Sequence, residues 1–237
     1  MSELKAVFFD VNDTLWDRTA CDRQVMQIVV DRYREHFPED DAEPVIRRFN
    51  AVLFELLGRQ HLRERRSLSH RSRFEALLDA YGVQARALAR EMARTFDTTR
   101  RLMMRQFLRP ETLKLLWRLG RRDLQRGVIM NGQPAVQRHL LQTLGLRPHL
   151  DHTLLAEVEG HYKPDVRLFR RTLEMLELDA EQMLYVGDSP LTDLLGAARA
   201  GIPTVWFNPG HRRLPNGWPT PDFTIHNLGE LYGIIET

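Results

Sequence analysis

The chain has 237 residues, of which 43% are hydrophobic and 28% are charged, as in an ordinary globular protein. The net charge of +2 gives no reason to expect nucleic acid as a partner, and no apolar stretch approaches the roughly 18 residues of a membrane span. The segment MSELKAVFFDVNDTLW has no signal-peptide cleavage site, and the single Cys21 excludes an intrachain disulfide. We therefore expect a cytoplasmic protein that contacts neither membrane nor nucleic acid.

Short continuous apolar runs indicate strands that are buried on both faces of a parallel sheet. The first is Ala6–Phe9, which ends abruptly at Asp10. Similar runs follow at residues 128–130, 153–156, 183–186 and 204–207, and a weaker one at residues 223–225. Helical patterns separate them at residues 136–144, 166–178 and 191–200. This alternation predicts a doubly wound α/β fold with a parallel sheet.

The stretch from residue 18 to residue 106 differs in kind, because its apolar residues recur with helical spacing and it has no strand pattern. A helix is expected to end near Gly82, and another, at residues 111–119, to stop at Gly120. We therefore predict a core domain of residues 1–16 and 107–237, with an all-helical domain of residues 17–106 inserted after the first strand.

Several polar residues and one glycine lie near the ends of the predicted strands, which is where open parallel sheets bind ligands. The set consists of Asp10, Asn12, Asn131, Gly132, Lys163, Asp188 and Asp193. Each residue alone has an ordinary explanation, since a carboxylate after a strand is often a helix cap and a lysine usually lies at the surface. Together, the three carboxylates would repel one another, even with one ammonium beside them, unless a cation completed the site. Hard oxygen ligands with spare coordination positions suit Mg²⁺.

Three segments, FFDVNDTLWD, HYKPD and VGDSPLTD, resemble motifs I, III and IV of the haloacid dehalogenase superfamily. The resemblance covers essentially the whole chain outside the insertion, and the insertion resembles the C1-type cap of that superfamily. The tail that follows GAARAGIPT resembles the pyrimidine 5′-nucleotidase-like phosphatases. The resemblance implies a Rossmann-like core and a Mg²⁺-dependent phosphomonoesterase that acts on a small phosphorylated metabolite. We expect a monomer or a homodimer.

The same resemblance assigns roles to the polar set. Asp10 would be the nucleophile that forms an aspartyl-phosphate, and Lys163 would neutralise Asp10 and the phosphoryl oxygens. The metal would be held by Asp10, by the backbone carbonyl of Asn12 and by Asp188, with Asp193 supporting the metal shell. The segment Asn131-Gly132, together with Lys163, would bind the phosphate.

Two positions depart from the family pattern. Asn12 stands where the phosphatases have the aspartate that acts as general acid and base, and an amide cannot exchange a proton near neutral pH. Loss of such a group typically lowers the rate by about 10²–10⁴-fold. Met130 stands directly before Asn131, where a serine or threonine usually binds the phosphoryl group.

These departures leave three hypotheses open. The first is an active but slow phosphomonoesterase. The second is a catalytically impaired relative that binds phosphate and Mg²⁺ without useful turnover. The third is a metal-independent 2-haloacid dehalogenase, because dehalogenases also lack the second aspartate of motif I.

Two basic groups outside the motifs have no assigned role. Residues 61–73 carry five arginines: Arg63, Arg65, Arg66, Arg71 and Arg73. Such a cluster can grip an anionic substrate, but a solvated helix face or a loop is the more common case, and the serines here favour a connection between cap helices. A loop bounded by Pro and Gly carries His211, Arg212 and Arg213, and it either reaches the cleft or lies at the surface. Hinges for a cap are expected near residues 16–18 and 107–110. Four aromatic residues are expected in the core of the cap: Phe49, Phe54, Phe74 and Tyr81.

Overall fold

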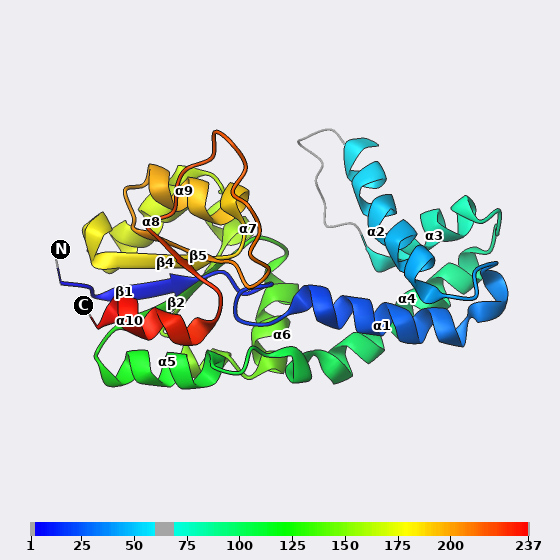
Figure 1. Ribbon diagram of the computed structural model, residues 1–237, viewed down its shortest axis with the longest axis horizontal. Coiled ribbons are helices and arrows are strands. Elements are labelled where there is room, and N and C mark those ends of the chain that lie inside the picture. The colour runs from blue at the N-terminus through cyan, green and yellow to red at the C-terminus, as the bar shows by residue number, and fades with distance from the viewer. Residues whose placement is uncertain (1–2, 60–68, 237) are drawn as a thin grey trace. The chain divides into compact units, whose positions relative to one another are not determined.

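A computed structural model describes residues 3–59 and 69–236 of the chain. It divides into two compact units, which we call the core unit, Met1–Asp17 with Leu108–Thr237, and the helical unit, Arg18–Phe107 (Figure 1). Both boundaries lie one residue later than the sequence boundaries given above.

The core unit is built on one six-stranded sheet in which every neighbouring pair is parallel. The strands are β1 Ala6–Phe9, β2 Gln125–Met130, β3 His152–Leu155, β4 Met183–Gly187, β5 Thr204–Phe207 and β6 Phe223–Ile225. Their order in the sheet is β3-β2-β1-β4-β5-β6, so β1 has β2 on one side and β4 on the other. The direction of winding reverses at β1, which makes the carboxyl ends of β1 and β4 the expected ligand position. The predicted doubly wound fold is confirmed.

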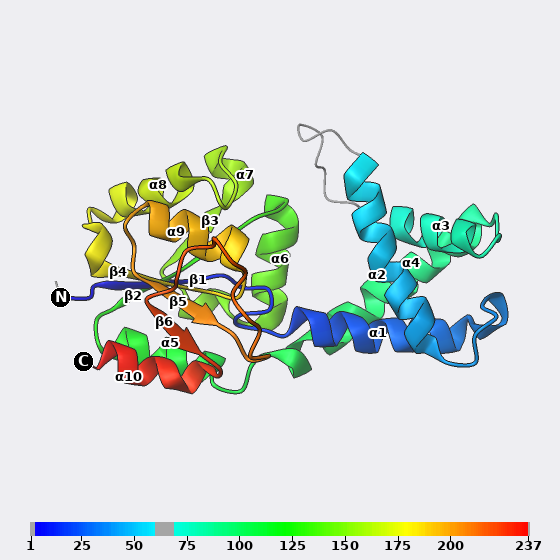
Figure 2. The same cartoon turned by 45° about the horizontal axis from the view of Figure 1, so that its top comes forward.

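Helices cover both faces of this sheet, with α8 and α9 on one face and α5 and α10 on the other (Figure 2). The helices are α5 Thr112–Arg121, α6 Pro134–Leu144, α7 Ala156–Glu159, α8 Val166–Leu176, α9 Leu195–Arg199 and α10 Leu231–Ile235. On the α8 face, the fully buried Phe8 and Tyr185 of the strands pack with Leu168 and Phe169 of α8. This buried apolar layer packs across the paired strands β1 and β4.

Three of the six strands, β1, β5 and β6, have the predicted bounds, and the other three differ by one to three residues at one or both ends. Among the helices, two differences have identifiable reasons. The predicted stop at Gly120 was wrong, because α5 continues to Arg121. The guanidinium of Arg126 lies over Gly120, where a Cβ atom would come within 2.3 Å of it, so Gly120 leaves room for this side chain. The pattern at residues 191–200 is a π-helical turn, Pro190–Leu194, followed by the short α9.

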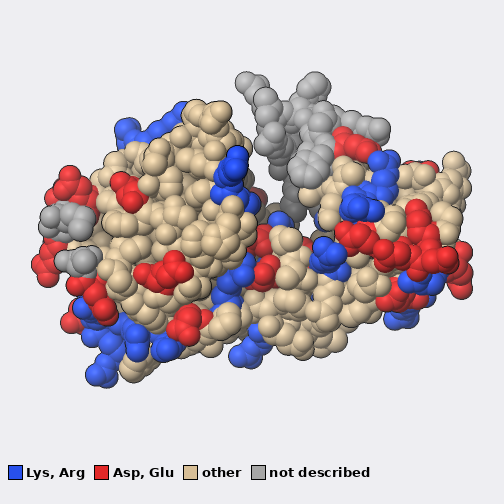
Figure 3. All heavy atoms as spheres, viewed as in Figure 1, with Lys and Arg blue, Asp and Glu red and all other residues tan. Residues whose placement is uncertain are grey.

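The helical unit contains α1 Arg18–Arg32, α2 Ala42–Arg59, α3 His70–Ala80 and α4 Arg86–Met103. Its aromatic centre joins Phe49, Phe74 and Phe96, whose ring centroids lie 4.7–6.1 Å apart. Phe49 and Phe74 are buried as predicted, Tyr81 is partly buried, and the side chain of Phe54 lies outside the described residues. Figure 3 shows acidic side chains in a band across this unit with basic side chains beside them. No helix in the described stretches is both long and apolar enough to cross a bilayer.

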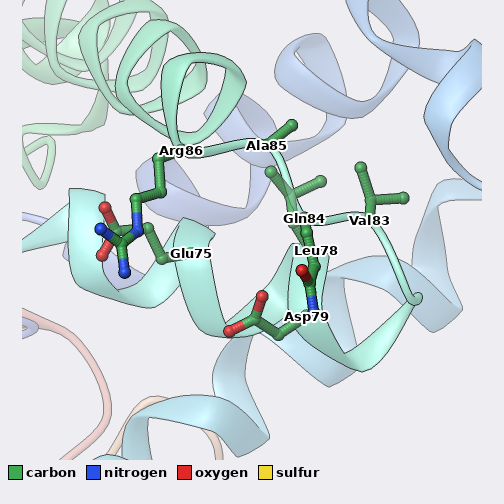
Figure 4. Close-up of a pocket in the computed structure, with 7 residues that line it drawn as sticks. All are labelled: Glu75, Leu78, Asp79, Val83, Gln84, Ala85 and Arg86. Atoms are coloured by element: carbon green, nitrogen blue, oxygen red, sulfur yellow. The ribbon is translucent and has the colours of Figure 1, made fainter.

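A surface hollow of about 640 Å³ lies between α3 and the start of α4 (Figure 4). Its lining includes Glu75, Asp79 and Arg86, and the head groups of Glu75 and Arg86 point toward one another. None of its lining residues combines burial with a titratable head group in the way that the strand ends of the core unit do.

Candidate active site

The site begins where β1 and β4 end together. Asp10 directly follows β1, and its backbone N–H donates to the carbonyl of Val186 in β4 at 2.9 Å. Asp188 directly follows β4, and Asp193 lies in the π-helical turn after it. One carboxylate oxygen from each of these three residues lies within 4.8 Å of the others. Residues that are far apart in sequence therefore form one acidic cluster.

The Lys163 ammonium is directed into this cluster. Its Nζ donates to Asp10 Oδ1 at 2.6 Å, to Asp193 Oδ1 at 2.7 Å and to the hydroxyl of Tyr185 at 3.1 Å. Lys163 is only 6% exposed, so it cannot exchange these partners for bulk water. A buried ammonium with three short acceptors is fixed in place and polarises the carboxylate of Asp10.

Asp193 can lie close to the end of β4 because residue 187 is a glycine. A Cβ atom on Gly187 would lie 2.5 Å from the Cβ of Asp193, so this position accepts only glycine without a shift. Asp193 Oδ2 accepts from the backbone N–H of Ser189 at 3.1 Å, and Oδ1 accepts from Lys163 and from the Tyr185 hydroxyl, the latter at 3.3 Å. Both oxygens thus have protein donors, which suits a carboxylate that supports its neighbours.

Burial and mutual repulsion shift the titration of the cluster. Burial, together with the charge of Asp193, raises the pKa of Asp10 to about 6, although Lys163 opposes the rise. Burial and the nearby carboxylates of Asp193, Asp10 and Asp13 raise the pKa of Asp188 to about 7. Burial disfavours the charged form of Lys163, but Asp10 and Asp193 outweigh it and raise the Lys163 pKa well above its usual value.

The donor set fits a divalent cation. Three carboxylates outnumber the two cations beside them, the Lys163 ammonium and the Arg212 guanidinium 3.6 Å from Asp188, and their oxygens are close enough to bind one ion. Hard oxygen donors of this kind are the ligands that Mg²⁺ prefers.

Asn131 and Gly132 follow β2, but the Asn131 amide is turned toward the backbone of Lys163. Its Nδ2 donates to the Lys163 carbonyl at 3.1 Å, and its Oδ1 accepts from the Lys163 N–H at 2.9 Å. Asn131 therefore positions the lysine, and phosphate binding by Asn131 and Gly132 stays a prediction. Met130 is buried and brings no polar donor.

Asn12 lies in the loop that leaves β1. Its Oδ1 accepts from the indole N–H of the fully buried Trp16 at 3.2 Å. The loop is held in place by Thr112, whose hydroxyl donates to the carbonyl of Leu15 at 2.7 Å. An aspartate at position 12 could accept the same indole hydrogen bond, so the fold does not require the amide.

Tyr185 was not predicted, although the sequence carries a signal for it. It is the one residue with a hydroxyl in the apolar strand Met183–Gly187, and a buried tyrosine hydroxyl normally finds a polar partner. Here the partners are Lys163 and Asp193.

The arginines of residues 61–73 differ from one another in their surroundings. Arg63, Arg65 and Arg66 lie outside the described residues. Arg71 is exposed and pairs with Glu75 at 2.9 Å, as expected of a solvated face. Arg73 contradicts that expectation, because it is buried against the ring of Phe49.

The loop after β5 carries the second basic group, His211, Arg212 and Arg213. His211 stacks on His226, with ring centroids 3.9 Å apart, while the adjacent Arg212 donates to the backbone carbonyl of Asp188 at 2.6 Å. This loop therefore reaches the acidic cluster through Arg212.

Two curated relatives are 37% identical to parts of the chain. Phosphoserine phosphatase from Thermus thermophilus matches over 158 residues, 67% of this chain and 61% of the relative. Pyrimidine 5′-nucleotidase YjjG from Escherichia coli matches over 110 residues, 46% of this chain and 48% of the relative. The chain thus spans less than two thirds of the length of both.

Two further matches extend along the whole chain. (S)-2-haloacid dehalogenase from Pseudomonas sp. strain YL is 30% identical along a match that covers 100% of this chain and 97% of the relative. The crystal structure of the putative HAD-hydrolase YfnB from Bacillus subtilis, bound to magnesium, superposes with a TM-score of 0.79 over 100% of both chains at 23% identity. Residues 4–201 match the haloacid dehalogenase-like hydrolases as a family. By this match and by its parallel sheet with the acidic cluster at the strand ends, the chain belongs to the haloacid dehalogenase-like hydrolase family.

Proposed function

We propose that the protein is a slow Mg²⁺-dependent phosphomonoesterase that acts on a small phosphorylated metabolite, with the helical unit as a substrate-selecting cap. The observation that carries the proposal is the Lys163 ammonium bound between Asp10 and Asp193, with the Asp188 carboxylate in the same cluster. Two relatives with phosphatase or nucleotidase names support this reaction class. The relative in which magnesium is bound has the same fold.

The cation would be held by the carboxylates of Asp10 and Asp188 and the backbone carbonyl of Asn12, with Asp193 in support. When bound, it supplies positive charge to the phosphoryl oxygens and offsets the repulsion among the carboxylates.

The chain's own groups would carry the covalent steps. A carboxylate oxygen of Asp10 attacks phosphorus, the bond from phosphorus to the ester oxygen breaks, and an aspartyl-phosphate remains. Lys163 holds the Asp10 carboxylate in position and stabilises negative charge on the phosphoryl group. Water then attacks phosphorus, which releases inorganic phosphate and restores the Asp10 carboxylate.

Asn12 would set the speed of both steps. The leaving oxygen needs a proton and the attacking water must lose one, and an amide side chain does neither. Both proton transfers would therefore go to solvent, which makes the second step in particular slow.

The test is hydrolysis of a panel of phosphate esters by the wild-type chain and by Asn12→Asp, each with Mg²⁺ and with EDTA. We expect Mg²⁺-dependent turnover that rises about 10²–10⁴-fold in Asn12→Asp, and none in Asp10→Asn. Turnover that is the same in EDTA would contradict the magnesium mechanism. Magnesium binding without hydrolysis by either protein would instead indicate an impaired binding protein.

A dehalogenase is the second candidate, because the (S)-2-haloacid dehalogenase relative matches the entire chain at 30% identity. In that reaction the Asp10 carboxylate would attack carbon and displace halide, and the resulting ester would be hydrolysed. Release of halide from a 2-haloacid in EDTA, with no hydrolysis of phosphate esters, would favour this candidate over the phosphatase.

A further inference from the structure

The backbone carbonyl of Asp188 is held by two side chains that lie outside the acidic cluster. Arg212 Nη2 donates to it at 2.6 Å, and the indole Nε1–H of Trp206 donates to it at 3.1 Å. Trp206 lies on β5 beside Gly187 of β4, so the sheet itself carries the indole to this carbonyl. The residue that supplies one of the three converging carboxylates therefore has its main chain fixed from the side of β5.

Arg212 is itself anchored by a buried amide. Asn208 Nδ2 donates to the Arg212 carbonyl and Asn208 Oδ1 accepts from the Arg212 N–H, both at 2.9 Å. Asn208 is 3% exposed, and its backbone is tied to β6, because its N–H donates to Ile225 and its carbonyl accepts from His226, both at 2.7 Å. The backbone that carries the guanidinium is thus hydrogen-bonded to Asn208, which is in turn hydrogen-bonded to the end of β6.

The guanidinium also lies close to the Asp188 carboxylate, with 3.6 Å between Nη2 and Oδ2. A positive charge there has two effects of opposite sign on a bound cation. It repels the cation, and it holds the Asp188 carboxylate in position to bind it. The shorter distance is to the backbone carbonyl, which indicates that the hydrogen bond governs this contact.

We propose that Arg212 is a positioning residue for the metal centre, which holds Asp188 toward Asp10 and Asp193 and thereby raises the affinity for Mg²⁺. This inference rests on the proposed function, since it requires that the acidic cluster binds the ion. Arg212 acts through Asp188 and not on the reacting atoms.

The experiment is calorimetric titration of Mg²⁺ into the full chain and three variants. We expect Arg212→Met to weaken Mg²⁺ binding about 10-fold, the lower end of what loss of a supporting hydrogen bond does at metal sites. Arg212→Lys should recover part of the loss, because an ammonium donates to the carbonyl without the planar fork. Arg213→Met, which removes the exposed neighbouring arginine, should bind as the wild type does.

A further variant removes the second hydrogen bond to the Asp188 carbonyl. Trp206→Phe keeps an aromatic ring and removes the N–H, and we expect Mg²⁺ binding about two- to ten-fold weaker, as for one hydrogen bond. Thermal unfolding in EDTA should be nearly the same for the wild type and Arg212→Met, so that a change in affinity reports the site and not general stability. Trp206→Phe shrinks a buried side chain and should unfold at a somewhat lower temperature, so its binding is measured well below that temperature.

The possible results distinguish a failure of this inference from a failure of the proposed function. If the wild type binds no Mg²⁺, the proposed function fails and this inference fails with it. If the wild type binds Mg²⁺ and Arg212→Met binds it equally well or more tightly, only the positioning role fails. Unchanged affinity with a raised KM for a phosphate ester would assign Arg212 to the substrate instead and would overturn the proposal.

Discussion

Among the residues that the structure describes, each unit buries one cation, and the two cations have opposite surroundings. Lys163 in the core unit is 6% exposed and Arg73 in the helical unit is 8% exposed. Lys163 has carboxylates at 2.6 and 2.7 Å. Arg73 has none within ion-pair distance in the part of the chain that the structure describes. Its Nη2 donates to the Phe49 carbonyl at 3.2 Å and to Asn50 Oδ1 at 3.4 Å, and its guanidinium carbon lies 3.8 Å from the Phe49 ring centroid.

The difference shows that burial of a charge does not by itself mark an active site. Burial lowers the pKa of Arg73 to about 10, because no adjacent carboxylate compensates fully for the lost hydration. The pKa of Lys163 moves the other way, because Asp10 and Asp193 outweigh the same penalty. What distinguishes the core unit is that opposite charges converge from separate strand ends.

The largest expected effect comes from Lys163→Met. It leaves the carboxylates of Asp10 and Asp193 buried without their ammonium, and we expect turnover with Mg²⁺ to fall by about 10²–10³-fold or more. Steady-state hydrolysis of a phosphate ester measures this. The matched control is Arg73→Met, which removes the other buried cation and should leave kcat within a few-fold of wild type. Equal losses in the two variants would break the comparison.

Next in size is a dependence of stability on pH that Mg²⁺ should abolish. The pKa values of Asp10 and Asp188 are raised to about 6 and 7 in the folded chain, so between about pH 4 and 7 the folded state holds more protons than the unfolded state. Stability of the metal-free protein should therefore fall as pH rises through this range. Urea unfolding in EDTA at pH 5 and pH 8 checks the sign. Saturating Mg²⁺ should stabilise the protein more at pH 8, because the ion competes with protons.

A smaller effect is expected from Tyr185→Phe. The change removes only the hydroxyl that joins Lys163 to Asp193, and we expect a loss of about 1 kcal/mol in stability and a few-fold fall in kcat. Unfolding by denaturant and steady-state kinetics measure the two quantities. A fall in kcat as large as that of Lys163→Met would show that Tyr185 takes part in the reaction itself.

The smallest effect concerns the stability of Arg73→Met. A buried cation without a paired carboxylate is replaced by an apolar side chain of similar length, so the free energy of unfolding should stay within about 1 kcal/mol of wild type, with either sign. Lys163→Met, by contrast, should lose about 3–5 kcal/mol, because it breaks a buried ion pair. Similar losses in both would show that the contacts of Arg73 with Phe49 and Asn50 stabilise the fold as much as the ion pairs of Lys163 do, which would contradict this difference.

The sequence predicted the sheet well because buried parallel strands have a strong local signature. The runs at Ala6–Phe9 and Thr204–Phe207 have the bounds of the strands themselves, and the carboxyl ends of adjacent strands necessarily meet. Asp10, Lys163, Asp188 and Asp193 lie together as the motif resemblance implied.

Local signals failed where a residue's role depends on a neighbour that is distant in sequence. The bonds of Arg212 to Asp188 and of Asn131 to Lys163 join segments 24 and 32 residues apart, and no periodicity reports them. Arg73 was expected in a solvated run, yet the Phe49 ring covers it. Helix α4 was not singled out, although its buried Ala89, Met92, Ala93 and Phe96 have helical spacing.

The central claim is that Asp10 forms a covalent intermediate in a site that lacks a general base. With p-nitrophenyl phosphate the leaving group needs no proton, so Asn12 should slow only the hydrolysis of the intermediate, which then accumulates. Mass spectrometry of the protein after rapid mixing with this ester and Mg²⁺ tests this directly. We predict that one phosphoryl group is found on Asp10 in the wild type and that far less is found in Asn12→Asp. Hydrolysis that proceeds with no phosphoryl group on Asp10 in either protein would contradict the account.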